Sequence, residues 1–162
     1  MARANMMWRG SFVCIFNNRF TKVLLLNRNW EKKKKERKVW EGSPRWGNIG
    51  GSVEAGETPL QACIREASEE IGVNLGPERL VLVHVRRRPA AKPTPYVAHF
   101  YATTMGEGTR IRLNDESKGY GWFRLEDLPD GLLDDKEDLI GWRDTAKGKL
   151  KLSTAGSKGR AG

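Results

Sequence analysis

Short apolar runs separated by turn residues dominate the pattern of hydrophobic and polar positions along the chain. Ser11–Phe16 and Lys22–Leu26 are two such runs, and Asn17 and Asn18 form a turn between them, which predicts an antiparallel hairpin. Three later segments also have strand-like patterns: Arg79–Arg88, Tyr96–Thr104 and Gly119–Arg124. A proline-rich connection joins the first two of these three.

A helical pattern begins after residue 57, where several local signals agree. Thr58 is a good N-cap, Pro59 suits the first helical position, and Gln61 completes a capping box. Gly72 suits the C′ position, where a left-handed backbone ends a helix. The sequence therefore predicts a helix over Pro59–Ile71.

The remaining segments complete a mixed order of strands and helices. Asn27–Pro44 has no clear period, and we expect a long exposed loop with a frayed helical piece. Trp46–Val53 is rich in glycine and predicts a strand end followed by a turn. Leu125–Leu128 predicts a turn or short helix, and Leu132–Trp142 predicts a final helix. This order predicts an α+β fold with one central core.

Length and composition fit a single globular domain. The chain has 162 residues, of which 38% are hydrophobic and 30% charged, so it is long enough to bury a core. We expect a domain over residues 1–150 and a basic tail over 151–162, disordered from Ser153 onward. No apolar run approaches the roughly 18 residues that span a bilayer, the N-terminus lacks the apolar stretch of a signal peptide, and Cys14 and Cys63 form no metal or redox motif. These features predict a cytoplasmic protein with reduced thiols.

The formal net charge of +9 permits an anionic partner, such as a phosphate group, a nucleotide or a nucleic acid. Many basic proteins bind nothing acidic, so charge alone decides little. A dense basic run lies at Lys32–Lys38, with Trp30, Trp40 and Trp46 around it. Tryptophans between basic residues can stack bases, but we interpret this run as a solvated loop.

Against this basic background, three glutamates gather near the end of the predicted helix. Glu69 and Glu70 follow Glu66 by three and four residues, so on a helix the three side chains project from one face. Like charges at i and i+4 destabilise a helix, as do carboxylates in its last turn, each by a few tenths of a kcal/mol. A solvated acidic face is one interpretation. The other is a site for Mg²⁺ or Mn²⁺, hard ions that prefer oxygen ligands.

The wider stretch favours the metal site, because it resembles the Nudix box, G-x5-E-x7-R-E-U-x-E-E-x-G-U, where U is a bulky aliphatic residue. Eight residues fall at the required spacing: Gly51, Glu57, Arg65, Glu66, Glu69, Glu70, Gly72 and Val73. Ala67 is smaller than the usual aliphatic residue, and Ile49 stands where the approach to the box often has proline. Neither departure touches a carboxylate.

The resemblance implies an α/β/α sandwich with a central mixed sheet, and hydrolysis of a nucleoside diphosphate linked to another group. It implies that Glu66, Glu69 and Glu70 ligate Mg²⁺, or alternatively Mn²⁺, with help from the carbonyl of Gly50. It also implies three supporting residues around them: Gly51, Glu57 and Arg65. The general base varies within the family, which leaves Glu66 and Glu116 as the two candidates.

The substrate is less well defined than the reaction. The candidates are a nucleoside triphosphate and a nucleoside diphosphate sugar such as ADP-ribose, with Arg86, Arg88 and Trp46 as candidate substrate-binding residues. A proline such as Pro89, sixteen residues after the box, marks many ADP-ribose pyrophosphatases. A tyrosine typical of some diadenosine polyphosphate hydrolases would fall near Ala90 and is absent. The alternative is an RNA-binding module, or an enzyme acting on RNA 5′ ends, that uses the basic loop.

Overall fold

A computed structural model describes residues 7–36, 44–88 and 94–158, with side chains described as far as residue 151. The described elements follow in chain order: β1 (Trp8–Phe16), β2 (Lys22–Arg28), α1 (Trp30–Lys35), β3 (Trp46–Gly47), β4 (Ile49–Ser52), α2 (Pro59–Ile71), the 3₁₀ helix η1 (Pro77–Arg79), β5 (Val81–Arg88), β6 (Tyr96–Thr104), β7 (Ser117–Arg124) and α3 (Lys136–Lys158).

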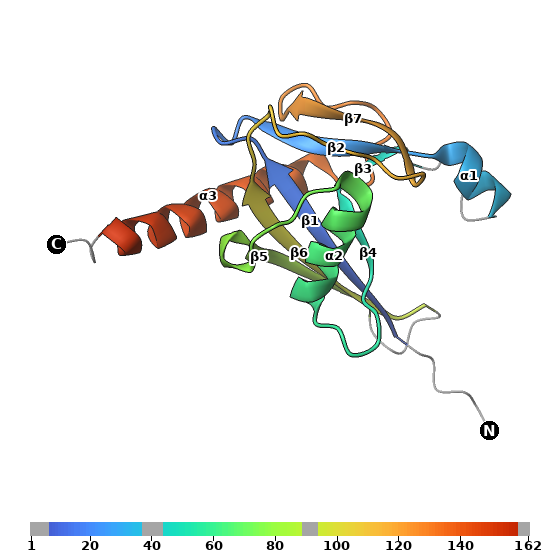
Figure 1. Cartoon of the computed structure of the whole chain (residues 1–162), viewed down its shortest axis with the longest axis horizontal. Coiled ribbons are helices and arrows are strands. Elements are labelled where there is room, and N and C mark those ends of the chain that lie inside the picture. The colour runs from blue at the N-terminus through green and yellow to red at the C-terminus, as the bar shows by residue number, and fades with distance from the viewer. Residues whose placement is uncertain (1–6, 37–43, 89–93, 159–162) are drawn as a thin grey trace.

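The strands form one mixed sheet that opens into two wings (Figure 1). In the first wing, β1 pairs in parallel with β6 and antiparallel with β4, while β5 pairs with the far side of β6. In the second wing, β2 pairs with β7 and β3. The predicted hairpin of β1 and β2 joins the wings, and it does so through only two residue pairs, Ile15 with Leu24 and Phe16 with Val23.

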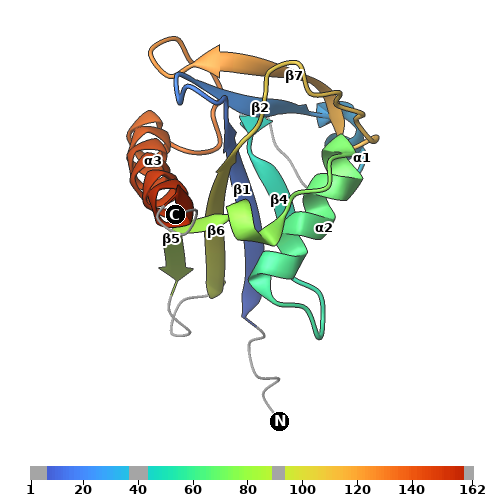
Figure 2. The ribbon, with the colours of Figure 1, turned by 60° about the vertical axis from the view of Figure 1, so that its left-hand side comes forward.

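Helices cover both faces of the first wing, because alternate side chains of its strands are apolar on both sides. Val13 and Ile15 of β1 belong to a buried cluster that includes residues of α2. Cys14 and Phe16 belong to a second buried cluster, which includes Leu139 and Trp142 of α3. Figure 2 shows α2 and α3 on opposite sides of the sheet. The predicted α/β/α fold with a central mixed sheet is confirmed.

The last helix differs from the prediction at both ends. Residues 132–135 are held against β3 instead of starting the helix: Leu132 forms a β-bridge with Trp46, and the Leu133 N–H donates to the Trp46 carbonyl at 2.8 Å. Helix α3 therefore begins at Lys136, and it continues to Lys158 through residues that we expected to belong to a disordered tail. Residues 159–162 of that tail lie outside the described part, and the domain boundary at residue 150 stays a prediction.

The loops follow the prediction except at one boundary. The expected loop over residues 27–44 contains a helical piece, α1, as we expected, and its residues 37–43 lie outside the described part. The strand expected from Arg79 begins only at Val81, because Pro77 starts a 3₁₀ turn. The connection that contains Pro89 and Ala90 also lies outside the described residues.

Both cysteine thiols are free and buried, Cys14 in the cluster next to α3 and Cys63 in the cluster next to α2. Burial raises the pKa of both thiols, so each is held as the neutral form. Within the described residues, no helix combines the length and the apolar character that crossing a bilayer would require.

Candidate active site

Helix α2 begins and ends as its sequence predicts. The Gln61 N–H donates to Thr58 Oγ1 at 3.1 Å, and the Thr58 N–H donates to Gln61 Oε1 at 2.9 Å, which completes the capping box. Gly72 ends the helix with φ at +67°. Ala67 is fully buried in the core, so the small residue in the aliphatic position of the box is a packed one. With that face fixed against the sheet, Glu66 and Glu70 project toward β4.

The two glycines at the start of β4 let these carboxylates approach the strand. The Gly50 N–H donates to Glu70 Oε2 at 2.8 Å. A Cβ on Gly51 would lie 2.5 Å from Glu66 Oε1, closer than side chains tolerate. Gly50 has φ at +156°, and a Cβ there would collide with the Ser11 carbonyl. A side chain at either position would displace the strand or a carboxylate.

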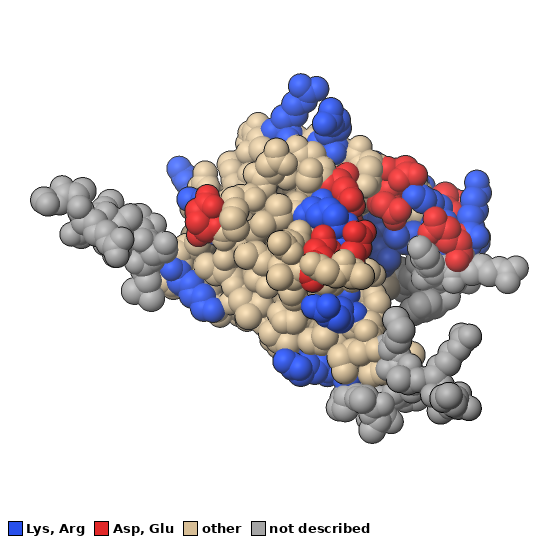
Figure 3. Space-filling view, turned by 60° about the horizontal axis from the view of Figure 1, so that its bottom comes forward, with Lys and Arg blue, Asp and Glu red and all other residues tan. Residues whose placement is uncertain are grey.

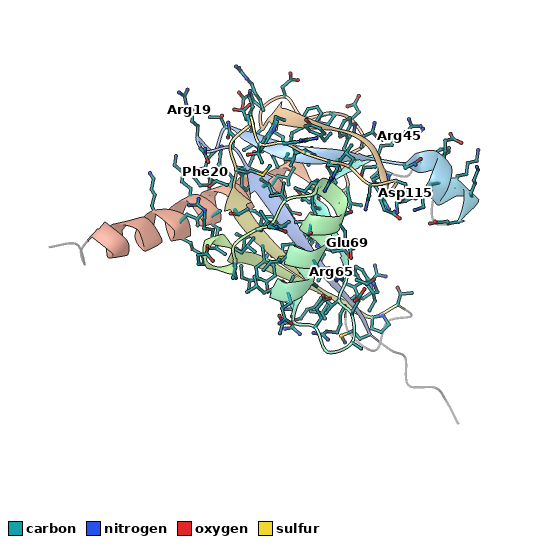
Figure 4. The ribbon with its side chains drawn as sticks, viewed as in Figure 1. Arg19, Phe20, Arg45, Arg65, Glu69 and Asp115 are labelled. Carbon is teal, nitrogen blue, oxygen red and sulfur yellow. The ribbon has the colours of Figure 1, made fainter. Side chains whose placement is uncertain are left out.

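Arg65 connects the carboxylates with the loop before the helix (Figure 4). Its guanidinium binds Glu57 through two hydrogen bonds, from Nε to Oε2 at 2.8 Å and from NH2 to Oε1 at 3.1 Å. NH1 donates to Glu66 Oε1 and to Glu69 Oε2, each at 3.2 Å, and NH2 also donates to the Ser52 carbonyl at 3.0 Å. The hydrogen bonds from Arg65 lower the pKa of Glu57. One guanidinium thus orients three carboxylates, which supports the positioning role predicted for Arg65.

Glu66 and Glu70 carry more negative charge than their surroundings neutralise. Burial, followed by the neighbouring charge of Glu66, raises the pKa of the Glu70 carboxyl to about 8. Burial also raises the pKa of Glu66, although Arg65 partly offsets this effect. A cation bound between the two carboxylates would offset the cost of burying them next to each other.

The three glutamates of α2 suit a hard divalent cation, although in this structure their carboxylates point toward other partners. Among the described residues, no three acidic, histidine or cysteine side chains converge closely enough to hold an ion. The reason lies in their partners: Glu66 and Glu69 turn toward Arg65, and Glu70 turns toward the Gly50 amide. Mg²⁺ and Mn²⁺ are hard cations, and both prefer carboxylate oxygens as ligands. Glu66, Glu69 and Glu70 therefore remain the candidate ligands, and the contact shown for Gly50 is made by its amide.

A cavity beside Glu70 brings the two wings together. Gly50 and Glu70 line it from the first wing, while Arg28, Lys33 and Glu116 line it from the side of β2 and β7. Figure 3 shows acidic side chains gathered on one part of the surface, with lysine and arginine side chains between them. The cavity thus places both charge signs next to the predicted metal ligands.

Glu116, one of the two candidate bases, is tightly ion-paired in this cavity. Lys32 Nζ and Lys33 Nζ donate to its two oxygens, each at 2.8 Å. These hydrogen bonds, that of Lys32 first, lower the pKa of Glu116 to about 2. A carboxylate held by two ammonium groups accepts a proton poorly, so its predicted role requires that it lose a partner.

An apolar cavity adjoins the charged one, and Phe12 and Leu133 line both. Half of its eight lining residues are aromatic: Trp8, Phe12, Tyr96 and Phe100. The Arg86 guanidinium lies over the Phe100 ring at 4.9 Å from its centroid, and its NH1 reaches the buried Asp134 at 3.4 Å. An aromatic cavity with a charged edge can hold a planar ring system with polar substituents.

Of the predicted substrate-binding residues, the structure places only Arg86 in this cavity. Arg88 binds Thr94 Oγ1 at 2.7 Å and lies over the Tyr96 ring, and it lines neither of the two cavities. Trp46 packs edge-on against Phe123, with 4.9 Å between ring centroids, and also lines neither.

Sequence reasoning missed Arg28, Lys33 and Phe12 as lining residues. The interpretation of the basic run as a solvated loop is wrong for Lys32 and Lys33, whose side chains are only 29% and 14% exposed. The run itself was visible in the sequence. Which lysines face the site depends on the long-range pairing of β2 with β7, for which the sequence has no local signal.

Comparisons with known proteins find relatives with named activities. The E. coli (strain K12) protein named dihydroneopterin triphosphate diphosphatase is 34% identical over 64 residues, which are 40% of this chain and 43% of that protein. A Rattus norvegicus protein named bis(5′-nucleosyl)-tetraphosphatase [asymmetrical] is 30% identical over 90 residues, 54% of this chain and 60% of that protein. The chain thus spans about half the length of the curated relatives it matches.

A solved structure and a family model extend the likeness to most of the chain. The crystal structure of a MutT NUDIX hydrolase from Burkholderia pseudomallei superposes with a TM-score of 0.61 at 28% identity, covering 85% of this chain and 96% of that one. The family model described as NUDIX domain matches residues 7–142. Because this match includes both wings, helix α2 and the start of α3, the chain belongs to the NUDIX family.

Proposed function

We propose that this protein is a divalent-cation-dependent hydrolase that cleaves a pyrophosphate linkage of a nucleotide, with Mg²⁺ as the cation and Mn²⁺ as the alternative. The observation that carries the proposal is the pair Glu66 and Glu70, half-buried against Gly50 and Gly51 beside a cavity lined by cationic side chains. Buried carboxylates need a cation, and a phosphate chain needs both that cation and basic residues.

The side chains divide the work as follows. Glu66, Glu69 and Glu70 would hold the cation, and Arg65 positions Glu66 and Glu69 through its NH1. When bound, the cation neutralises phosphate charge and lowers the pKa of a coordinated water. Glu66 and Glu116 are the two candidates to accept the proton of the attacking water. Glu116 can do so only after one of its lysine partners is displaced.

The apolar cavity would hold the base or another ring system of the substrate. Its aromatic walls offer stacking surfaces, and Arg86 with Asp134 offers a donor and an acceptor at the edge. Both curated relatives are named for substrates with three or four phosphates, which favours a triphosphate over ADP-ribose. RNA binding has less support, because Lys32 and Lys33 are largely buried beside the proposed metal site and do not form an open basic surface. The free, buried thiols fit a cytoplasmic location, which we also propose.

A nucleotide panel with Mg²⁺ and with Mn²⁺, run in ¹⁸O-water, tests the proposal and identifies the phosphorus that is attacked. We expect cation-dependent turnover that falls by at least about 100-fold in Glu70→Gln. Glu78→Gln is the matched control, because it neutralises an exposed carboxylate on η1 outside both cavities. Equal turnover in wild type and Glu70→Gln would refute the site. A steep salt dependence of RNA binding would instead favour the nucleic-acid function.

A further inference from the structure

The charged cavity contains two cations to which the proposed function assigns no individual role. Arg28, at the end of β2, lines the cavity with Lys33 of α1. Among the described residues, the Arg28 guanidinium has no acidic partner within ion-pair distance, unlike Arg65 and Arg86. Its backbone N–H is fixed by the Arg45 carbonyl at 2.7 Å, so the strand end is held in place. A cation that faces a cavity without a partner attracts an anionic ligand.

Lys33 can leave Glu116 without removing the last counter-charge of that carboxylate. Its Nζ lies 2.8 Å from Glu116 Oε2, and its side chain is the more buried of the two that bind Glu116. If Lys33 left, Glu116 would keep the ion pair with Lys32 at 2.8 Å, and Lys32 would keep Asp115 at 2.9 Å. The acid would therefore not be stranded without a counter-charge.

We propose that Arg28 and Lys33 form a binding site for a third phosphate, one that lies beyond the pyrophosphate held at the carboxylates of α2. This inference rests on the proposed function and narrows its substrate class to nucleotides with three or more phosphates. The planar guanidinium of Arg28 matches two phosphate oxygens, and the ammonium of Lys33 supplies a compact second charge. In occupying the site, the phosphate takes Lys33 from Glu116, so the arrival of the substrate frees one oxygen of that carboxylate.

The position of the site within one cavity supports this assignment. Glu70 and Lys33 line the same space, and the charge of Lys33 acts on Glu70. A phosphate chain that begins at the α2 carboxylates therefore continues toward Arg28 and Lys33. A nucleoside diphosphate sugar has no third phosphate to place there.

The test compares Arg28→Gln and Lys33→Gln with the wild type on two substrates, a nucleoside triphosphate and ADP-ribose, both with Mg²⁺. We expect the ratio of kcat/KM for the triphosphate to kcat/KM for ADP-ribose to fall about 10- to 100-fold in either variant, mainly through a higher KM for the triphosphate. Lys35→Gln is the matched control, because Lys35 lies on the same helix, is exposed, and does not line the cavity. Equal losses on both substrates would place the two cations at the scissile pyrophosphate and overturn the inference.

A binding measurement separates this inference from the proposed function. With Mg²⁺ present, isothermal titration calorimetry should show that wild type binds inorganic tripolyphosphate more tightly than pyrophosphate, and that either variant loses most of this difference. Lys35→Gln should keep it. This result would support the phosphate site even if no nucleotide were hydrolysed. An unchanged preference in both variants would overturn the inference even if hydrolysis were confirmed.

Discussion

The strongest quantitative prediction concerns how pH changes the stability of the metal-free protein through Glu70. Burial and the charge of Glu66 raise the pKa of this carboxyl from 4.5 to about 8. Between these two values the folded protein keeps a proton that the unfolded chain has released. The free energy of unfolding must therefore fall as pH rises through this window, by at most about 1.4 kcal/mol per pH unit for one proton.

The variant Glu70→Gln has no titrating carboxyl at this position, so its free energy of unfolding should change less with pH. We expect its free energy of unfolding relative to wild type to rise by roughly 2–3 kcal/mol between pH 5.5 and pH 7.5 in EDTA, as measured by urea unfolding. His99 has a lowered pKa through burial and contributes the opposite slope, but it is present in both proteins and cancels in the comparison. Glu78→Gln, at an exposed position, should follow the wild-type profile.

Added Mg²⁺ completes the test. A cation that binds the ionised carboxylates should stabilise wild type more at pH 7.5 than at pH 5.5, because protonated Glu70 competes with it. The stabilisation should largely disappear in Glu70→Gln. Parallel pH profiles of wild type and Glu70→Gln in EDTA would show that Glu70 titrates as an exposed carboxylate, and would refute the reasoning.

Three further changes have distinct expected results. Gly51→Ala should lower turnover more than 10-fold while costing roughly 1 kcal/mol of stability, because its Cβ would force Glu66 into another rotamer; unchanged turnover in an activity assay would contradict the crowding. Arg65→Lys should lose about 1–3 kcal/mol in urea unfolding, since lysine cannot make the double hydrogen bond to Glu57; wild-type stability would show that one bond suffices. Trp142→Ala should cost about 3–5 kcal/mol, because the ring is 4% exposed in the core; a loss below 1 kcal/mol would mean that the core refills the space.

Local signals were sufficient for much of the site. The bounds of α2 follow from its capping box and Gly72, and the spacing of the glutamates follows from the helix itself. The β1–β2 hairpin follows from two apolar runs and a turn. These features depend on residues that are close in sequence, so their physics can be evaluated without the rest of the fold.

The features that the sequence did not reveal depend on contacts between distant segments. Glu116 and Lys33 are 83 positions apart and meet only because β2 pairs with β7. Helix α3 starts late for the same reason, because the backbone of Leu132 and Leu133 pairs with Trp46 of β3. A tryptophan such as Trp46 can stack a base, but in this fold its ring packs edge-to-face with Phe123. The pattern of residues within one segment does not reveal which distant segment its side chains and backbone will contact.

Few strand pairs join the two wings, so the width of the site between them depends on how side chains pack in the core. Gly50 and Glu70 stand on one wing, whereas Arg28 and Glu116 stand on the other, and buried side chains of both wings, such as Leu24 and Ile49, pack in one cluster. A change of side-chain volume in the shared core would therefore alter the spacing of the two halves of the site. Buried, uncharged residues far from the charged cavity thus take part in setting its width.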